Sequence, residues 1–352
     1  MKKFAFSVTI ITLFLFLIGG LLTYSYLKSP VGGNNEVTFE IKEGDTFSGI
    51  SGRLKENKLI KSEMFYKFYL RTNGTGELKK GIHILNTNMN LSKILTVLAS
   101  ESNTKPTRIT FKEGRNMRYI VSEITKNFPI TDDEIYTKLK DKTYLDSLKE
   151  KYWFIDENIT NTKLYYSLEG YLFPDTYEYK GSATVEDIFS KMLDNMSIKV
   201  APYKKDIEDS AFNFHQVLTF ASMVELEATT KHDRMGVASV FYNRLDKKMT
   251  LGSDVTTYYA AKVDMGDRDL LKTELNELND YNTRNANMIG KLPVGPICNP
   301  SIISIEATLK PSISTNYYFV ADKNKKVYFT KNITEHNAII AKLKNEGLWF
   351  TY

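Results

Sequence analysis

The sequence of 352 residues contains one cysteine and four histidines. The single Cys298 excludes an intramolecular disulfide framework and any zinc or iron–sulfur site built from cysteines, because each needs at least two thiols from one chain. Among the histidines, His83, His215 and His232 show no spacing typical of a metal site. We therefore predict no bound metal and no cofactor.

Acidic residues are absent from the first 35 positions, where Lys2, Lys3 and Lys28 account for three of the five formal net charges. The rest of the chain is close to neutral and offers no broad positive field to a polyanion, so we predict no nucleic-acid partner. The composition, with 42% hydrophobic and 25% charged residues, is that of a folded chain. Its length is sufficient for two domains.

Charge is also missing from residues 4–27, a run of 24 positions. A helix rises about 1.5 Å per residue, so this run spans roughly 36 Å and can cross a hydrocarbon core of about 30 Å. We predict a transmembrane helix over residues 4–27, with residues 1–3 in the cytoplasm because Lys2 and Lys3 precede the helix. The rest of the chain then lies on the extracytoplasmic face of the cell membrane. A cleaved signal peptide is the alternative, but its apolar stretch would usually be shorter.

Residues 28–36 contain Pro, Gly and Asn and are predicted to form a linker. The apolar spacing that follows predicts a strand from Val37, a helix capped by Asp45 or Thr46, a helix over 62–70 and a strand over 80–85. The opening sequence IKEGDTFSGIS resembles that of a LysM module, a small glycan-binding fold. Residues 37–104 are thus predicted to form a LysM-like α+β module, with a purely structural α+β module as the alternative.

Residues 105–352 are predicted to form a second, larger α+β domain. Its segment 168–179, LEGYLFPDTYEY, interleaves three acids with aromatic rings, as sugar-binding clefts do, although an aromatic loop packed on the core is the better-supported interpretation. Four of the nine prolines lie between positions 293 and 311, so LPVGPICNP is predicted to be an extended, turn-rich loop that could wall a glycan groove.

A helix is predicted from Asn213 onward, because apolar residues recur at helical spacing as far as Ala228. Glu225 lies at the edge of this apolar stripe, where desolvation raises the pKa of a carboxyl towards the range of a general acid. Glu227 lies about 200° away around the helix, so the two carboxylates cannot serve one cleft. From position alone, a structural role for Glu225, in an ion pair with Arg234 or Lys231, is the better-supported interpretation.

The sequence motif around Glu225 favours a catalytic role for this residue. Residues 221–260, ASMVELEATTKHDRMGVASVFYNRLDKKMTLGSDVTTYYA, resemble the central motif of the YceG-like endolytic murein transglycosylases, the MltG family. The resemblance extends to LEGYLFPDTY, YNT, LPVGPICNPSI and YYFVAD, and thus covers nearly the whole chain. The chain departs from the residues usual in the family at Gly252, Val255, Arg284, Val294 and Ser301, the last of which is usually glycine.

The resemblance implies a YceG-like lytic transglycosylase domain and a membrane-anchored enzyme. Such an enzyme cleaves the β-1,4 bond between N-acetylmuramic acid and N-acetylglucosamine in nascent peptidoglycan, leaves 1,6-anhydro-muramic acid ends and terminates strand elongation. Glu225 matches the catalytic glutamate of the family and would act as acid and then as base. Further candidate cleft residues are Asn243, Ser253, Asp254, Tyr281, Asn282, Asn299 and His336. The implied partners are peptidoglycan glycan strands, the cytoplasmic membrane and peptidoglycan synthases.

Two other functions remain open from the sequence. One is a non-catalytic, membrane-anchored scaffold that binds peptidoglycan for the wall-synthesis machinery. The other is a hydrolase of the lysozyme type, which would leave reducing ends instead of anhydro ends.

Overall fold

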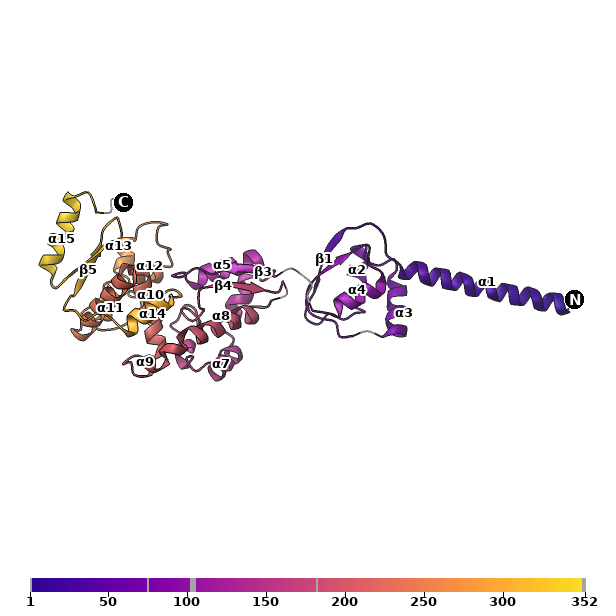
Figure 1. Ribbon diagram of the computed structural model, residues 1–352, viewed down its shortest axis with the longest axis horizontal. Helices are drawn as coiled ribbons and strands as arrows, with labels where there is room; N and C mark the ends of the chain where they lie inside the picture. The colour runs from indigo at the N-terminus through magenta and orange to yellow at the C-terminus, as the bar shows by residue number, and fades with distance from the viewer. Residues whose placement is uncertain (1, 75, 102–105, 182, 350–352) are drawn as a thin grey trace. The chain divides into compact units, whose positions relative to one another are not determined.

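The structure is a computed structural model that describes residues 2–74, 76–101, 106–181 and 183–349 (Figure 1). The chain is a mixture of helices and short strands, in agreement with the predicted α+β class. It divides into two compact units: unit 1 comprises Met1–Arg108 and Glu178–Ala183, and unit 2 comprises Ile109–Tyr177 and Thr184–Tyr352.

Unit 1 begins with one long apolar helix. Its elements are α1 (Lys2–Lys28), β1 (Glu36–Ile41), α2 (Ser51–Glu56), α3 (Glu63–Asn73), β2 (Gly81–Asn86) and α4 (Leu91–Leu98). Within α1, residues 9–28 have a mean hydropathy of 2.0 and are long and apolar enough to cross a membrane. None of this stretch is buried in the protein.

The core of unit 1 lies against a two-stranded antiparallel sheet in which Phe39 of β1 faces His83 of β2. Alternation along β1 buries Phe39 and Ile41, and the helices add Ile50, Leu54 and Ile94. The order strand, helix, helix, strand is the predicted one. The likeness to a LysM module stays a prediction.

The first helix of this module starts later than predicted. Asp45 does not cap it, because its carboxylate accepts a hydrogen bond from the Lys42 amide at 2.8 Å and pairs with Arg53. The Thr46 hydroxyl accepts from the Gly49 amide at 3.1 Å and caps a separate turn, so α2 itself begins only at Ser51.

Unit 2 contains most of the helices. The chain from β3 onward forms β3 (Thr107–Thr110), α5 (Met117–Asn127), α6 (Asp132–Lys138), α7 (Lys142–Lys151), η1 (Glu157–Thr160), β4 (Thr176–Tyr179), α8 (Val185–Val200), η2 (Ala201–Tyr203) and α9 (Lys204–Glu208). Then follow α10 (Phe214–Glu227), α11 (Lys231–Asp246), α12 (Asp254–Ala260), α13 (Lys272–Leu275), η3 (Ala286–Met288), α14 (Ile302–Leu309), β5 (Tyr318–Ala321), β6 (Val327–Thr330) and α15 (Ile333–Asn345). β3 pairs with β4, and β5 pairs with β6.

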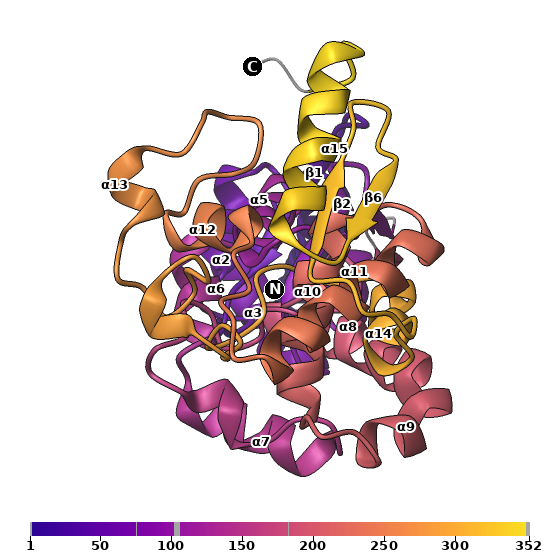
Figure 2. The same ribbon diagram turned by 90° about the vertical axis from the view of Figure 1, so that its left-hand side faces the viewer.

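Three helices, α10, α11 and α14, pack side by side and form the centre of unit 2 (Figure 2). Their shared core includes Phe220, Val237 and Phe241. The hairpin of β5 and β6 lies on α11 and is covered by α15. A Cβ atom at Gly236 of α11 would lie 2.3 Å from the Phe329 ring of β6, so the hairpin can approach this closely only because residue 236 is glycine.

The aromatic segment 168–179 belongs to the core. Tyr171, Phe173, Tyr177 and Tyr179 are all buried, as expected for the structural interpretation and not for an open sugar-binding surface. The proline-rich segment is extended as predicted, with an isolated bridge between Arg115 and Asn299.

Both tryptophans of the chain lie in unit 2. Trp153 is partly exposed at the end of α7, where its ring contacts Phe154 and Phe214 at centroid distances of 5.6 and 6.2 Å. Trp349 follows α15, and its amide donates to the carbonyl of Leu343.

Candidate active site

Glu225 lies in the last turn of α10, and its side chain is only 5% exposed. Its Oε1 accepts a hydrogen bond from Nη2 of Arg234 at 2.7 Å. Its Oε2 accepts two more, from the Ser301 amide at 3.0 Å and from the Ser301 hydroxyl at 2.6 Å. The carboxylate is therefore held in one orientation by three donors.

The ends of three helices meet at this carboxylate. Arg234 comes from the first turn of α11, and Ser301 is the N-cap of α14. Arg234 also donates from Nε to the carbonyl of Ala228, at the end of α10, and from Nη1 to the Ser301 hydroxyl, at 3.0 and 2.8 Å. One guanidinium thus connects all three helix ends, and the positive end of the α14 dipole further favours an anion here.

The pairing with Arg234 is the one that the structural interpretation of Glu225 predicts. The other predicted partner, Lys231, pairs instead with Glu306 at 2.8 Å. The Arg234 side chain is 8% exposed, so both charges are nearly removed from water. Their mutual attraction and the Ser301 donors compensate for this desolvation.

The loop before α5 passes close to the side chain of Glu225. Gly114 has a φ of +69°, and a Cβ atom there would lie 3.5 Å from Cγ of Glu225. Burial raises the pKa of the neighbouring Glu113 carboxyl, and the negative charge of Glu225 raises it further. Sequence reasoning missed both Glu113 and Ser301 as site residues, because neither shares a helix with Glu225 and no local spacing links them to it.

Asn299, a predicted cleft residue, has a structural role in this arrangement. Its Oδ1 accepts from the Leu172 amide at 3.1 Å, and its Nδ2 donates to the Arg115 carbonyl and to Glu169. It therefore ties the proline-rich loop to the loop before α5, and so places Ser301 beside Glu225.

Glu169 is a second buried carboxyl, with 1% exposure. Its Oε2 accepts from the Met117 amide and the Tyr259 hydroxyl, each at 2.9 Å. Burial nevertheless raises the pKa of Glu169 to about 7, because these donors only partly replace the lost water.

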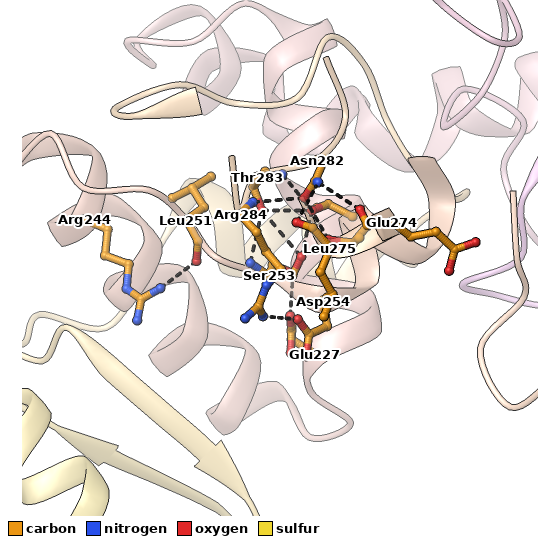
Figure 3. Close-up of polar contacts among 12 residues, drawn as sticks. Glu227, Arg244, Leu251, Ser253, Asp254, Glu274, Leu275, Asn282, Thr283 and Arg284 are labelled. Carbon is orange, nitrogen blue, oxygen red and sulfur yellow. Dashed lines mark hydrogen bonds and ion pairs between the residues drawn. The ribbon is translucent and has the colours of Figure 1, made fainter. Parts of the chain in front are cut away.

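Three predicted residues, Ser253, Asp254 and Asn282, lie together around the start of α12 (Figure 3). The Ser253 hydroxyl donates to Glu227 at 2.5 Å. Asn282 is fully buried: its Oδ1 accepts from the Thr257 hydroxyl, and its Nδ2 donates to backbone carbonyls of the α13 segment. Asp254 pairs with Arg284 but stays 60% exposed, so it is the most accessible of the three.

Glu227 accepts from Ser253, whereas Glu225 contacts Arg234 and Ser301. The two carboxyls thus use different partners, as their positions around the helix predict. Burial raises the pKa of Glu227 to about 7, against the lowering effect of the Ser253 hydrogen bond. A carboxyl with such a pKa suits a general acid, which makes Glu227 a candidate that sequence reasoning set aside.

The remaining predicted residues lie elsewhere in unit 2. Asn243 donates to the carbonyls of Ser314 and Asn316 and so fixes the chain after α14. His336 lies on α15 beside the Tyr318 ring, and burial lowers the pKa of its imidazole.

Tyr281 is 1% exposed, and its hydroxyl accepts from the Tyr165 amide at 3.2 Å. It borders a polar cavity of about 1080 Å³ that Tyr165 and Val294 also line. Glu225 does not line this cavity. Apart from the Ser253, Asp254 and Asn282 group, the predicted cleft residues are therefore dispersed in the described part of unit 2. Over the described residues there is also no group of three His, Cys, Asp or Glu side chains that could hold a metal ion.

The sequence model of the YceG-like family matches residues 39–342. A Bacillus subtilis (strain 168) protein named endolytic murein transglycosylase is 36% identical over 327 residues, which cover 91% of this chain and 89% of the relative. A Streptococcus pneumoniae (serotype 2, strain D39) protein of the same name is 30% identical over 353 residues, or 94% of this chain, and this chain spans 63% of its length. A crystal structure of a YceG-like protein from Listeria monocytogenes is 32% identical and superposes with a TM-score of 0.61 over 87% of this chain and all of that one.

Proposed function

Because the chain belongs to the YceG-like family, we propose that it is an endolytic murein transglycosylase, the activity for which its Bacillus and Streptococcus relatives are named. We propose further that it cleaves the β-1,4 bond that leaves N-acetylmuramic acid in nascent peptidoglycan, and so terminates strand elongation. The observation that supports this most is the carboxylate of Glu225, which is fixed where three helix ends meet.

Glu225 would perform both proton transfers of the reaction. As an acid it gives its proton to the glycosidic oxygen while the bond from C1 of muramic acid to that oxygen breaks. As a base it takes the proton from the C6 hydroxyl of the same sugar, whose oxygen then bonds to C1 and closes the 1,6-anhydro ring. The proton lost by O6 replaces the one given to the leaving sugar, and no water is consumed.

The surroundings of Glu225 stabilise its carboxylate form. In the carboxylate form, Arg234 balances the charge and the Ser301 hydroxyl donates. The same hydroxyl also accepts from Arg234 and from the Ser304 amide, which uses both of its lone pairs, so it remains a donor to Glu225. These contacts therefore fix the carboxylate that the second proton transfer needs as its base.

The test compares two neighbouring glutamates. We expect Glu225→Gln to lower the rate of glycan cleavage by a factor of about 10² to 10⁴, the usual contribution of a general acid and base. Glu227→Gln is the matched control, because it removes a carboxyl with a raised pKa from the same helix, and it should cost less than tenfold. Mass spectrometry of digested glycan strands should show 1,6-anhydro-muramic acid ends for the wild type and for Glu227→Gln.

Other results of this comparison would support a different function or a different catalytic acid. Reducing ends would indicate a lysozyme-type hydrolase, and bound but uncut glycan with the wild type would indicate a scaffold. Loss of activity in Glu227→Gln but not in Glu225→Gln would assign the acid to Glu227.

For location, we propose that α1 anchors the chain in the cell membrane with a cytoplasmic N-terminus, supported by the apolar stretch at residues 9–28. Residues 37–104 would then be a LysM-like module facing the wall, with glycan strands and peptidoglycan synthases as partners.

A further inference from the structure

Two large apolar side chains on α3 project into solvent. Met64 is 83% exposed and Phe68 is 52% exposed, whereas Tyr66 and Tyr69 on the opposite side of the helix are buried in unit 1. Exposed apolar residues one helical turn apart form a patch, and such patches commonly mark a binding surface.

The helix α3 contacts the outer end of α1. The Tyr24 ring lies 5.4 Å from that of Phe65 in an edge-on arrangement, and Nζ of Lys61 donates to the Tyr26 carbonyl at 2.8 Å. Tyr24 is four residues, or about 6 Å of helix, from Lys28 at the end of the apolar stretch. If α1 crosses a membrane, α3 therefore lies at the depth where headgroups meet acyl chains.

An apolar groove of about 920 Å³ separates the two helices. Leu15, Phe16 and Gly19 of α1 line one side, and Phe65 and Phe68 of α3 line the other. Because the α1 side of this groove belongs to the membrane-crossing stretch, the groove is continuous with the surface that acyl chains cover.

Positive charge borders the same patch. Lys67 and Arg71 are exposed on α3, at positions i+3 and i+7 from Met64, so both cations lie along one side of the apolar patch. Helices that lie in a membrane interface combine apolar side chains in the acyl boundary with Lys and Arg that reach the phosphates. The patch therefore matches a surface that is apolar below and anionic above.

We propose that α3 is a membrane-interface helix, seated in the leaflet from which α1 emerges, with Met64 and Phe68 among the acyl chains and Lys67 and Arg71 at the lipid phosphates. The occupant of the groove is a phospholipid acyl chain. The inference rests on the proposed membrane anchor, and it adds that unit 1 is held on the bilayer surface by a second element.

The test uses the full-length chain in nanodiscs of phosphatidylglycerol and phosphatidylethanolamine. An environment-sensitive fluorophore is attached to Met64→Cys, Phe68→Cys, Leu17→Cys within α1, or Thr96→Cys on the exposed face of α4 as the matched control. The native Cys298 is buried and should not react, which the unsubstituted protein checks. We expect blue-shifted emission at positions 64 and 68, and at least twofold stronger quenching by shallow acyl-chain spin labels than at position 96.

The Leu17 position separates the two proposals. If deep spin labels quench position 17 while positions 64 and 68 behave like position 96, the result supports the proposed membrane anchor and contradicts the interfacial role of α3. If position 17 is not quenched, the anchor itself is wrong. Blue-shifted emission at 64 and 68 that no lipid label quenches would assign the patch to another protein chain and overturn the proposal.

Discussion

Arg234 holds together the residues on which the proposed chemistry depends. Its guanidinium donates to Glu225, Ser301 and the Ala228 carbonyl, and little of it is exposed. A buried ion pair contributes little net stability while both partners are present, but the loss of one partner leaves an uncompensated charge. The same geometry that positions Glu225 therefore makes the fold sensitive to either residue alone.

A double-mutant cycle measures this dependence. We expect Arg234→Met to lower the free energy of unfolding by about 3–5 kcal/mol, because Glu225 would remain buried without its counter-charge. Adding Glu225→Gln to Arg234→Met should recover part of this loss, with a coupling energy of about 1–3 kcal/mol by denaturant titration of the four proteins. Strictly additive effects would show that the pair is not formed.

Glu169 gives the unfolding free energy a specific dependence on pH. Its pKa is raised from 4.5 to about 7 in the folded protein, so the folded state binds more protons than the unfolded state between these values. Stability from this group is therefore full below pH 4.5 and falls as the pH rises through 7. The shift corresponds to a loss of about 3 kcal/mol.

The comparison of wild type with Glu169→Gln isolates this group, because other titrations largely cancel in the difference. We expect the variant to gain stability relative to wild type between about pH 5 and pH 8, with little further change above. Denaturation midpoints at both pH values provide the measurement. A difference independent of pH would mean that the Glu169 carboxyl titrates normally.

Part of the site could be predicted from the sequence. The helical spacing around Glu225 follows from local periodicity, and Arg234, nine residues away, is one of the two partners expected from its closeness in sequence. The Ser301 and Gly114 contacts do not, because they depend on how the proline-rich loop and the loop before α5 fold back onto α10. The sequence suggests Asn282 and Asn299 as substrate-binding residues. Their side-chain amides instead form hydrogen bonds with buried backbone groups, which only the three-dimensional packing shows.

Among the elements, capping boxes depend least on tertiary packing. Thr131 with Glu134 and Asn213 with Gln216 form capping boxes, and both bonds of such a box lie within four residues, so a local sequence pattern can predict them. The start of α2 was predicted too early, since Asp45 binds backward to Lys42 and pairs with Arg53. A local pattern cannot show which of several donors an Asp side chain will choose.

The packing of α11 against β6 depends on a single missing side chain. Gly236→Ala would ordinarily favour a helix by about 1 kcal/mol, but the new methyl group would lie 2.3 Å from the Phe329 ring. We expect the clash to dominate and to lower the unfolding free energy by about 1–3 kcal/mol, as measured by scanning calorimetry.

Two further variants check this explanation. Phe329→Leu should rescue part of the loss in Gly236→Ala, because it removes the ring that the methyl group would meet. Gly52→Ala in α2 is the matched control: its Cβ would contact nothing within 4 Å, so stability should stay level or rise. Equal losses for both alanines would contradict the packing explanation.

For the whole molecule, the proposed topology makes a direct prediction about cells. The full chain should stay in the membrane pellet after an alkaline wash, and a chain that begins at residue 29 should not. External protease applied to spheroplasts should degrade everything after α1, because the positive residues before the helix keep only its N-terminus inside. Release of the full chain by the wash would contradict a spanning helix. Protection from the protease would indicate the opposite orientation of the helix.

The distribution of the two tryptophans has a practical consequence. Trp153 and Trp349 are the only indoles in the 352 residues, and both belong to unit 2. Indole emission therefore reports the unfolding of unit 2 alone, with no signal from unit 1, to which α1 belongs. Far-ultraviolet circular dichroism, in contrast, detects the helices of both units. A denaturation followed by both signals at once would show whether the two units melt together or in separate steps.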